Sequence, residues 1–131
     1  MNYLLDTNVV LQAVASPERL NKTAIAILGD VNSVLYFSAV SVWEIAIKAG
    51  IGKLRLPESP AKFVAKSTQA LNLLPLPITQ VHALGVFKLP KHHADPFDRM
   101  LIAQAEAENL ALLTADRVFQ NYDLKIIDCG K

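Results

Sequence analysis

The sequence predicts an α/β fold of three layers, in which helices cover both faces of a central, mainly parallel sheet. Short apolar runs that suit buried strands alternate with longer stretches that suit helices, from one end of the chain to the other. Strands separated by helices pair in parallel and need helices on both faces. The chain has 131 residues, of which 52% are hydrophobic and 19% charged. These values predict one folded domain over residues 1–131 with a buried core.

The first 37 residues are expected to form a strand, two helices and a second strand, in that order. The apolar run 3–5 stops at Asp6, and the helix that follows continues until Pro17 breaks it. Residues 34–37 are β-branched and aromatic, which predicts a buried strand. Between them, a second helix is expected to carry an apolar face made of Ala24, Ile25, Ile27, Leu28 and Val31.

The middle of the chain predicts two helices joined by a basic segment. A third helix follows residues 38–41 and ends at Gly50 and Gly52. Residues 53–57 form an extended connector, and Pro60 begins the fourth helix. This helix is expected to bury Phe63, Val64 and Leu71.

The next part predicts a weak strand and two helices. The run 73–78 is apolar but contains two prolines, which place it at a sheet edge. Thr79 is expected to cap a helix that carries Val81, Leu84 and Phe87. After the polar loop 90–94, the Asp-Pro pair at 95–96 opens the longest helix.

The last part predicts two strands, residues 111–114 and 125–128, on either side of a short helix. Asp116 follows the first of these strands and also suits the cap of the short helix. Strands and helices thus alternate over the whole chain.

Four acidic residues are expected at one edge of this sheet. Asp6 ends the first strand, Asp116 lies just past the fourth, and Glu44 and Asp98 lie near the starts of the third and sixth helices. Ligands of open parallel sheets collect at the carboxyl ends of the strands, where helix N-termini also point. Carboxylates gathered there repel unless a cation neutralises them. Mg²⁺ suits such oxygen ligands, and it activates water for attack on a phosphodiester.

Each acid also has a purely structural explanation. Glu44 fits a capping box begun by Ser41, or it pairs with Lys48 one turn on. Asp95 suits the cap of the long helix, and Asp98 then lies at its positive end. For one acid alone the structural interpretation is the better one, but capping gives no reason for several acids to share one edge.

The remaining residues exclude other classes of protein. No uncharged apolar run approaches the roughly 18 residues that cross a bilayer, and no secretory signal is visible at the N-terminus. The single Cys129 cannot form an internal disulfide, so we expect a cytoplasmic protein. His92 and His93 are adjacent and the chain has no Cys cluster, so no zinc pattern is present.

Four segments in order resemble the PIN-domain nucleases, most closely the VapC-type toxins of bacterial toxin–antitoxin pairs, over the whole length of the chain. The segments are Leu4-Leu5-Asp6-Thr7-Asn8, residues 41–48 with Gly52-Lys53-Leu54, residues 93–103 from His93 to Ala103, and Leu113-Thr114-Ala115-Asp116.

The resemblance implies a Mg²⁺-dependent endoribonuclease with a PIN-like fold, for which Mn²⁺ substitutes. Its catalytic and metal-binding acids map onto Asp6, Glu44, Asp98 and Asp116. Supporting polar groups map onto Asn8, Ser41 and Thr114, and Asp95 is a helix cap or an outer residue of the site. The resemblance further implies an RNA substrate, inhibition of translation and growth, a homodimer, and a cognate antitoxin that covers the acidic site.

Three alternatives remain open at this point. One is a PIN-domain nuclease that processes RNA without an antitoxin or acts on DNA. Another is a phosphatase of the haloacid-dehalogenase type, although Asn8 stands where that class has its general acid. The third, a phospho-receiver domain, lacks the paired acids after the first strand and the Lys after the last.

The charges are divided unevenly along the chain. The net charge is only +1, from 13 Lys and Arg and 12 Asp and Glu, which argues against a protein that coats nucleic acid. Residues 48–94 nevertheless hold seven Lys or Arg and a single acid, Glu58. This middle segment is suited to contact a phosphate backbone. The candidates for an RNA track are Lys53, Arg55, Lys88 and Lys91.

Overall fold

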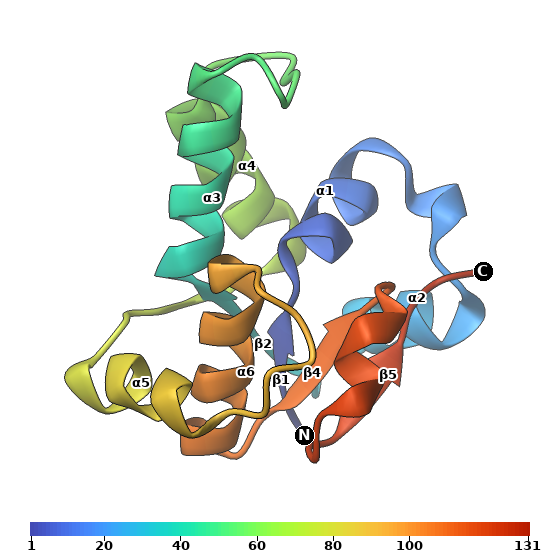
Figure 1. Cartoon of the computed structure of the whole chain (residues 1–131). Helices are drawn as coiled ribbons and strands as arrows, with labels where there is room; N and C mark the ends of the chain where they lie inside the picture. Colours follow the sequence, from blue (N-terminus) through green and yellow to red (C-terminus); the bar gives the residue numbers. More distant parts are fainter.

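All five predicted strands form and pair in parallel, in the order β3-β2-β1-β4-β5, in a computed structural model that describes residues 1–131 (Figure 1). The prolines of the third run leave it short and place it at the edge of the sheet, as predicted. The strands are β1 (Asn2–Leu5), β2 (Val34–Ser38), β3 (Leu74–Leu76), β4 (Ala111–Thr114) and β5 (Ile126–Asp128).

Six α-helices and three short 3-10 helices connect the strands. The α-helices are α1 (Thr7–Ala15), α2 (Lys22–Gly29), α3 (Ala39–Gly50), α4 (Pro60–Leu71), α5 (Gln80–Gly85) and α6 (Pro96–Glu108). The 3-10 helices are η1 (Pro17–Arg19), η2 (Val86–Lys88) and η3 (Arg117–Asn121). None of the helices combines the length and the apolar character that crossing a membrane requires.

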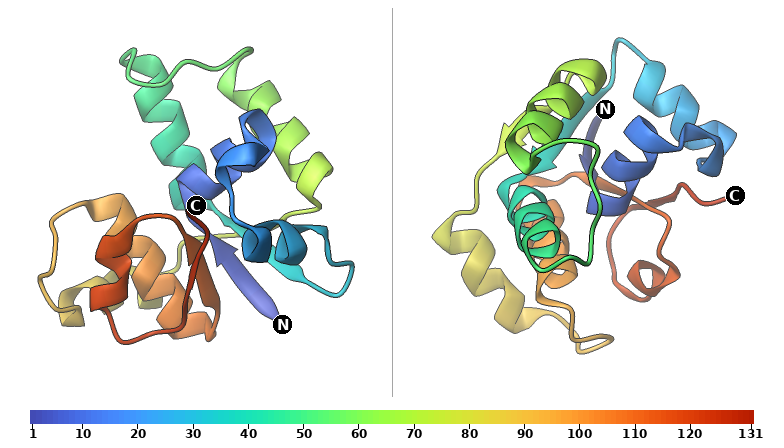
Figure 2. Two further views of the ribbon diagram at one scale, coloured as in Figure 1. Left: turned by 90° about the vertical axis from the view of Figure 1, so that its right-hand side faces the viewer. Right: turned by 90° about the horizontal axis from the view of Figure 1, so that it is seen from above.

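The alternation of side chains along the strands divides the core into two layers. On β1, Tyr3 and Leu5 pack with residues of α1, α2 and α4, whereas Leu4 packs on the other face with residues of α6 and η3. The views in Figure 2 show these two groups of helices on opposite sides of the sheet. The fold is therefore the predicted three-layer α/β/α sandwich.

The helices begin and end where local sequence signals place them. Ser59 caps α4 and Asp95 caps α6, each through its side-chain oxygen and each followed by proline. Both helices end at an asparagine in the left-handed conformation, Asn72 with φ 54° and Asn109 with φ 56°. Asparagine tolerates this conformation better than most residues, so these ends are set locally.

The start of α3 differs from the prediction. Ser38, not Ser41, is the N-cap, because its hydroxyl accepts a hydrogen bond from the Val40 N–H at 3.0 Å. The predicted capping box between Ser41 and Glu44 is therefore wrong. Since Ser41 lies inside the helix, its hydroxyl is available for a contact with another element.

The predicted apolar faces of the second and fifth helices also differ, and Ile25 in α2 is 46% exposed. Val31 lies beyond the end of α2 and is 96% exposed, because the helix stops at Gly29 and turns at Asp30. The fifth helix ends at Gly85 and tightens into η2, which leaves Phe87 92% exposed. Val81 and Leu84 within α5 are also exposed, at 70% and 73%, so the whole predicted apolar face of this helix lies outside the core.

The strand order gives the sheet a switch point at its centre. From β1 the chain proceeds outward to β2 and β3, then crosses over to β4 and β5 on the other side of β1. At such a point the connections leave the carboxyl ends of β1 and β4 in opposite directions and open a crevice between them. Asp6 and Asp116 follow these two strand ends.

Candidate active site

Asp6 lies at the centre of this sheet edge and is almost completely buried. It is the N-cap residue of α1, but its side chain caps no backbone N–H. Its Oδ2 instead accepts a hydrogen bond of 2.8 Å from the Thr114 hydroxyl at the end of β4. The side chain is therefore held across the switch point instead of serving its own helix.

Glu44 is buried on the second turn of α3 and is held by two neighbours. Its Oε1 accepts a 2.7 Å hydrogen bond from the Thr7 hydroxyl, whose oxygen lies 2.8 Å from that of Ser41. Its Oε2 lies 2.6 Å from Lys48 Nζ, which is the ion pair proposed as its structural explanation. This hydrogen bond raises the pKa of Lys48.

Asp98 lies in the first turn of α6, near the loop that precedes the helix. Asp95 accepts hydrogen bonds from the N–H groups of Phe97 and Asp98, at 2.9 and 3.2 Å, and is confirmed as the helix cap. The carboxylate of Asp98 is free of this capping task. Its Oδ2 lies 3.3 Å from His93 Nε2.

Asp116 is the most exposed of the four acids and is linked to the others through Thr114. Its backbone N–H donates to the Thr114 hydroxyl oxygen at 3.0 Å, and its side chain caps η3 by accepting from the Val118 N–H at 3.0 Å. The structural explanation of this acid as a cap is thus confirmed. Its carboxylate nevertheless acts electrostatically on both Asp6 and Asp98.

Burial and mutual repulsion perturb two of the carboxyl groups. Burial raises the pKa of Asp6 to about 6, with contributions from the charges of Glu44 and Asp116, and the hydrogen bond from Thr114 opposes this rise. Burial also raises the pKa of Asp98 to about 8, helped by the negative charges of Asp6, Asp95, Glu44 and Asp116. The acids are therefore close enough to repel one another, which the strand and helix positions predicted.

The four acids are the type of ligand that a hard divalent cation prefers, but their side chains are not arranged around one metal position. All four side chains supply carboxylate oxygens, the ligands that Mg²⁺ prefers, and their shared negative charge favours a cation. No three His, Cys, Asp or Glu side chains are already grouped as metal ligands, since the acids turn toward protein partners instead. A site made of three or more of these acids would therefore require rotation of some of their side chains.

The predicted RNA track falls into two separate groups. Lys53 and Arg55 lie on the loop between α3 and α4, whereas Lys88 and Lys91 lie in η2 and the loop after it, and these segments lie apart in Figure 1. All four side chains are exposed. The structure does not join them into one continuous surface.

Each group nevertheless borders a segment that carries site residues. Arg55 lines a cavity of about 240 Å³ together with the exposed Asn8, which follows Asp6 and Thr7. Lys91 lines another, of about 430 Å³, with His93 and Arg99. Asn8 makes no hydrogen bond to the acids. Thr7, not Asn8, is the polar residue after Asp6 that contacts an acid, Glu44.

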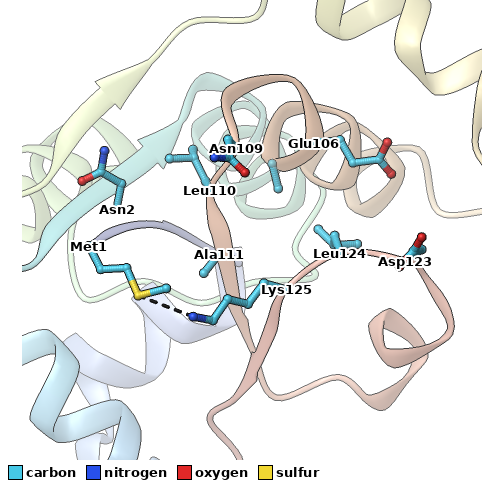
Figure 3. A pocket seen from close by; sticks show the side chains of 10 residues that line it. Met1, Asn2, Glu106, Asn109, Leu110, Ala111, Asp123, Leu124 and Lys125 are labelled. Carbon is cyan, nitrogen blue, oxygen red and sulfur yellow. Dashed lines mark hydrogen bonds between the residues drawn. The ribbon is translucent and has the colours of Figure 1, made fainter.

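A further cavity, of about 670 Å³, lies at the opposite edge of the sheet and contains none of the four acids. Residues at the amino ends of β1, β4 and β5 line it, including Met1, Ala111 and Lys125 (Figure 3). Lys125 Nζ lies 3.6 Å from Met1 Sδ. This cavity is thus separate from the carboxyl ends of the strands, where the acids gather.

Two residues near the acids were not singled out from the sequence. Thr7 was named only as part of the first motif, yet it contacts Glu44 and Ser41. His93 was assigned no role, yet its ring lies beside Asp98. Both residues lie within the four ordered motifs. The partners of Thr7 are 34 and 37 positions away, however, and His93 lies in a loop, so no local pattern predicts these contacts.

Comparisons with known proteins agree with this geometry. Residues 3–125 match the model of the PIN domain family. Ribonuclease VapC16 of Mycobacterium tuberculosis is 37% identical over 65 residues, which are 50% of this chain and 45% of that protein. The chain thus matches less than half the length of this relative.

Two solved structures share the fold over nearly the whole chain. VapBC2 from Rickettsia felis, bound to a promoter DNA fragment, has a TM-score of 0.76 and 18% identity and covers 99% of this chain and 100% of its own. VapBC-1 from nontypeable Haemophilus influenzae has a TM-score of 0.68 and 21% identity and covers 98% of each chain. The family match, the shared fold and the acids at the switch point lead to one conclusion: this chain belongs to the PIN domain family.

Proposed function

We propose that this chain is a Mg²⁺-dependent endoribonuclease and the toxin of a VapBC-type toxin–antitoxin pair. The observation that carries the proposal is the gathering of Asp6, Glu44, Asp98 and Asp116 at the switch point of a PIN-domain sheet. Cleavage of RNA phosphodiesters by such a toxin inhibits translation and growth. Residues 1–131 act in this proposal as one PIN-like nuclease domain.

The comparisons support this proposal over the alternatives. The relative with 37% identity is named a ribonuclease, and the two solved structures are toxin–antitoxin complexes. The family match favours a nuclease over a phosphatase or a phospho-receiver domain. A PIN-domain nuclease that processes RNA without an antitoxin remains the second candidate.

The four acids divide the work by their positions. Asp6 and Glu44 are buried and held by Thr114 and Thr7, so they provide fixed oxygen ligands. Asp98 and Asp116 are more accessible, so we assign them to the side of the site that a substrate phosphate approaches. When bound, Mg²⁺ or Mn²⁺ supplies a Lewis acid that lowers the pKa of water and stabilises charge on the phosphate. Water attacks phosphorus, the bond to the leaving oxygen breaks, and that oxygen takes up a proton.

RNA cleavage by isosteric variants tests the assignment. Purified Asp6→Asn and Asp98→Asn proteins should fold normally. The pKa of each carboxyl group is raised in the folded state, so folding already favours an uncharged side chain at both positions. Both should lose Mg²⁺-dependent cleavage of RNA by at least about a hundredfold. Cleavage at the wild-type rate would sink the assignment, and turnover of a phosphate monoester without RNA cleavage would favour the phosphatase.

The proposal includes two protein partners, an antitoxin and a second copy of the chain. An exposed apolar surface on α5 and η2 is suited to a protein contact, since Val81 is 70%, Leu84 73% and Phe87 92% exposed. We assign this surface to the homodimer and the acidic edge to the antitoxin.

Light scattering tests the dimer. The wild type should have the mass of a dimer, and Phe87→Glu should have that of a monomer with an unchanged circular dichroism spectrum. Co-expression with a small open reading frame directly upstream tests the antitoxin, which should co-purify and block RNA cleavage. Cleavage that no such product blocks would favour the RNA-processing alternative.

A further inference from the structure

Arg99 fixes the loop that enters α6. Its Nη1 donates to the carbonyl oxygens of Pro90 and His93, at 2.8 and 3.5 Å, and its Nη2 to those of Val86 and Leu89, at 3.2 and 3.3 Å. One guanidinium group, next to Asp98 in the chain, thus binds four carbonyl groups of the segment before the helix. The position of His93 relative to α6 is therefore set by backbone contacts.

Tyr122 determines which nitrogen of His93 carries a proton. The Tyr122 hydroxyl is buried, lies 2.7 Å from His93 Nδ1, and accepts from Arg99 Nη1 at 3.3 Å. A guanidinium has no lone pair, so the hydrogen of this hydroxyl has only Nδ1 to bind. Since Nδ1 accepts, the neutral imidazole carries its proton on Nε2.

His93 Nε2 lies beside the Asp98 carboxylate. Nε2 is buried and lies 3.3 Å from Asp98 Oδ2, yet it makes no hydrogen bond. A buried donor without an acceptor destabilises the protein, and the carboxylate is the group within reach. A small rotation of the Asp98 side chain completes the bond.

We propose that His93 is a positioning residue for Asp98, and the proposal rests on the proposed function of the acidic site. The Nε2–H holds Oδ2 of Asp98 and leaves the second carboxylate oxygen free for the reaction. His93 is not itself a ligand, because Tyr122 occupies Nδ1 and Nε2 carries a proton. Arg99, Tyr122 and His93 are joined by hydrogen bonds, and rotation of the Asp98 side chain would add the last one and orient this acid of the site.

The test compares two variants that differ in one N–H group. His93→Gln retains a donor near the position of Nε2, whereas His93→Leu has no donor. Isothermal titration of Mn²⁺ into the RNA-free protein should show roughly tenfold weaker binding for His93→Leu and nearly wild-type binding for His93→Gln. RNA cleavage should change in the same order: the kcat of His93→Leu should fall with an unchanged KM, and that of His93→Gln should stay near the wild-type value. His92→Leu is the matched control, because His92 is exposed and its ring packs against Tyr122 without a hydrogen bond.

Nitrogen NMR of the imidazole gives a readout that needs no activity. The metal-free wild type should show His93 protonated at Nε2, and Tyr122→Phe, which removes only the hydroxyl, should lose this preference. A proton on Nδ1 in the wild type, or equal Mn²⁺ affinity of the Leu and Gln variants, overturns the proposal. If His93→Leu fails to fold, Tyr122→Phe takes its place in the Mn²⁺ titration. A wild type that cleaves no RNA refutes the proposed function, and the spectra and Mn²⁺ binding still decide the role of His93.

Discussion

The Thr114 hydroxyl donates to Asp6 Oδ2 at 2.8 Å and joins two residues that are 108 positions apart in the chain. The same hydroxyl oxygen accepts from the backbone N–H of Asp116 at 3.0 Å. One side chain at the end of β4 therefore holds the acid after β1 and the backbone of the acid after β4. This contact is possible because β1 and β4 are neighbours in the sheet, with Leu5 opposite Leu113.

Removal of this hydroxyl should make Asp6 harder to ionise. The hydrogen bond from Thr114 lowers the pKa of Asp6 against the effect of burial, so Thr114→Val should raise that pKa further. Loss of a hydrogen bond to a charged group should also cost about 1.5–3 kcal/mol at neutral pH. Urea denaturation measures the second effect, and carboxyl ¹³C NMR titration measures the first. Thr114→Ser, which retains the hydroxyl, is the control, and a Val variant that matches it in both measurements would contradict this role.

The metal-free protein should become less stable as pH rises. The pKa values of Asp6 and Asp98 are about 6 and about 8 in the folded protein, against 3.8 ordinarily, so folding favours their protonated forms. This contribution to the free energy of unfolding is complete below pH 3.8 and is lost as pH rises through about 6 and then about 8. Thermal unfolding in EDTA measures it across this range.

Two comparisons isolate the carboxylates in that experiment. Asp98→Asn should flatten the upper part of the pH dependence, because the amide does not ionise. Mg²⁺ should raise the Tm of the wild type at pH 8 more than at pH 5, since it binds the ionised acids. Equal pH slopes for the wild type and Asp98→Asn would show that Asp98 is not the group that titrates.

Asp95 should matter for stability but not for cleavage. Its Oδ1 binds the N–H groups of Phe97 and Asp98, so Asp95→Ala should cost about 0.5–2 kcal/mol in the free energy of unfolding. Asp95→Asn retains a capping oxygen and should unfold like the wild type. Both variants should cleave RNA within a few-fold of the wild-type rate. If Asp95→Asn folds normally and loses cleavage, Asp95 is a ligand and not only a cap.

The two basic groups should contribute separately to RNA binding. The double variants Lys53→Gln/Arg55→Gln and Lys88→Gln/Lys91→Gln each remove two charges, and each should reduce the slope of log K against log salt by about 1.4. RNA binding in EDTA, measured by fluorescence anisotropy over a salt series, gives this slope without cleavage. Lys125→Gln is the control, because it lies at the opposite edge of the sheet. A double variant with the wild-type slope would mark its pair as ordinary surface.

Local signals in the sequence predicted the elements that local interactions form. The predicted caps at Thr79 and Asp95 bind N–H groups two or three residues on, so neighbouring residues suffice to place them. The strand runs were correct because burial selects short apolar segments. The error at Ser41 arose because Ser38, three residues earlier, also suits the helix start, and the error at Val31 arose because a turn ends α2 before it.

The four acids were selected from the sequence because parallel strands must end at one edge of the sheet. This rule needs only the alternation of strands and helices, and the structure shows the resulting repulsion in the raised pKa values of Asp6 and Asp98. Their assignment as catalytic and metal-binding residues stays a prediction until the variants are measured.

The sequence by itself therefore determined the fold class, the caps at Thr79 and Asp95 and the acids at the sheet edge, since each depends on residue type and local spacing. Only the tertiary structure decided which hydroxyl holds which acid and how His93 faces Asp98. The order of the strands brings Thr114 to Asp6, and the packing of α3 against α1 brings Glu44 to Thr7. These contacts join segments far apart in the chain, so they form only when the whole core packs and fixes the positions of the strands and helices.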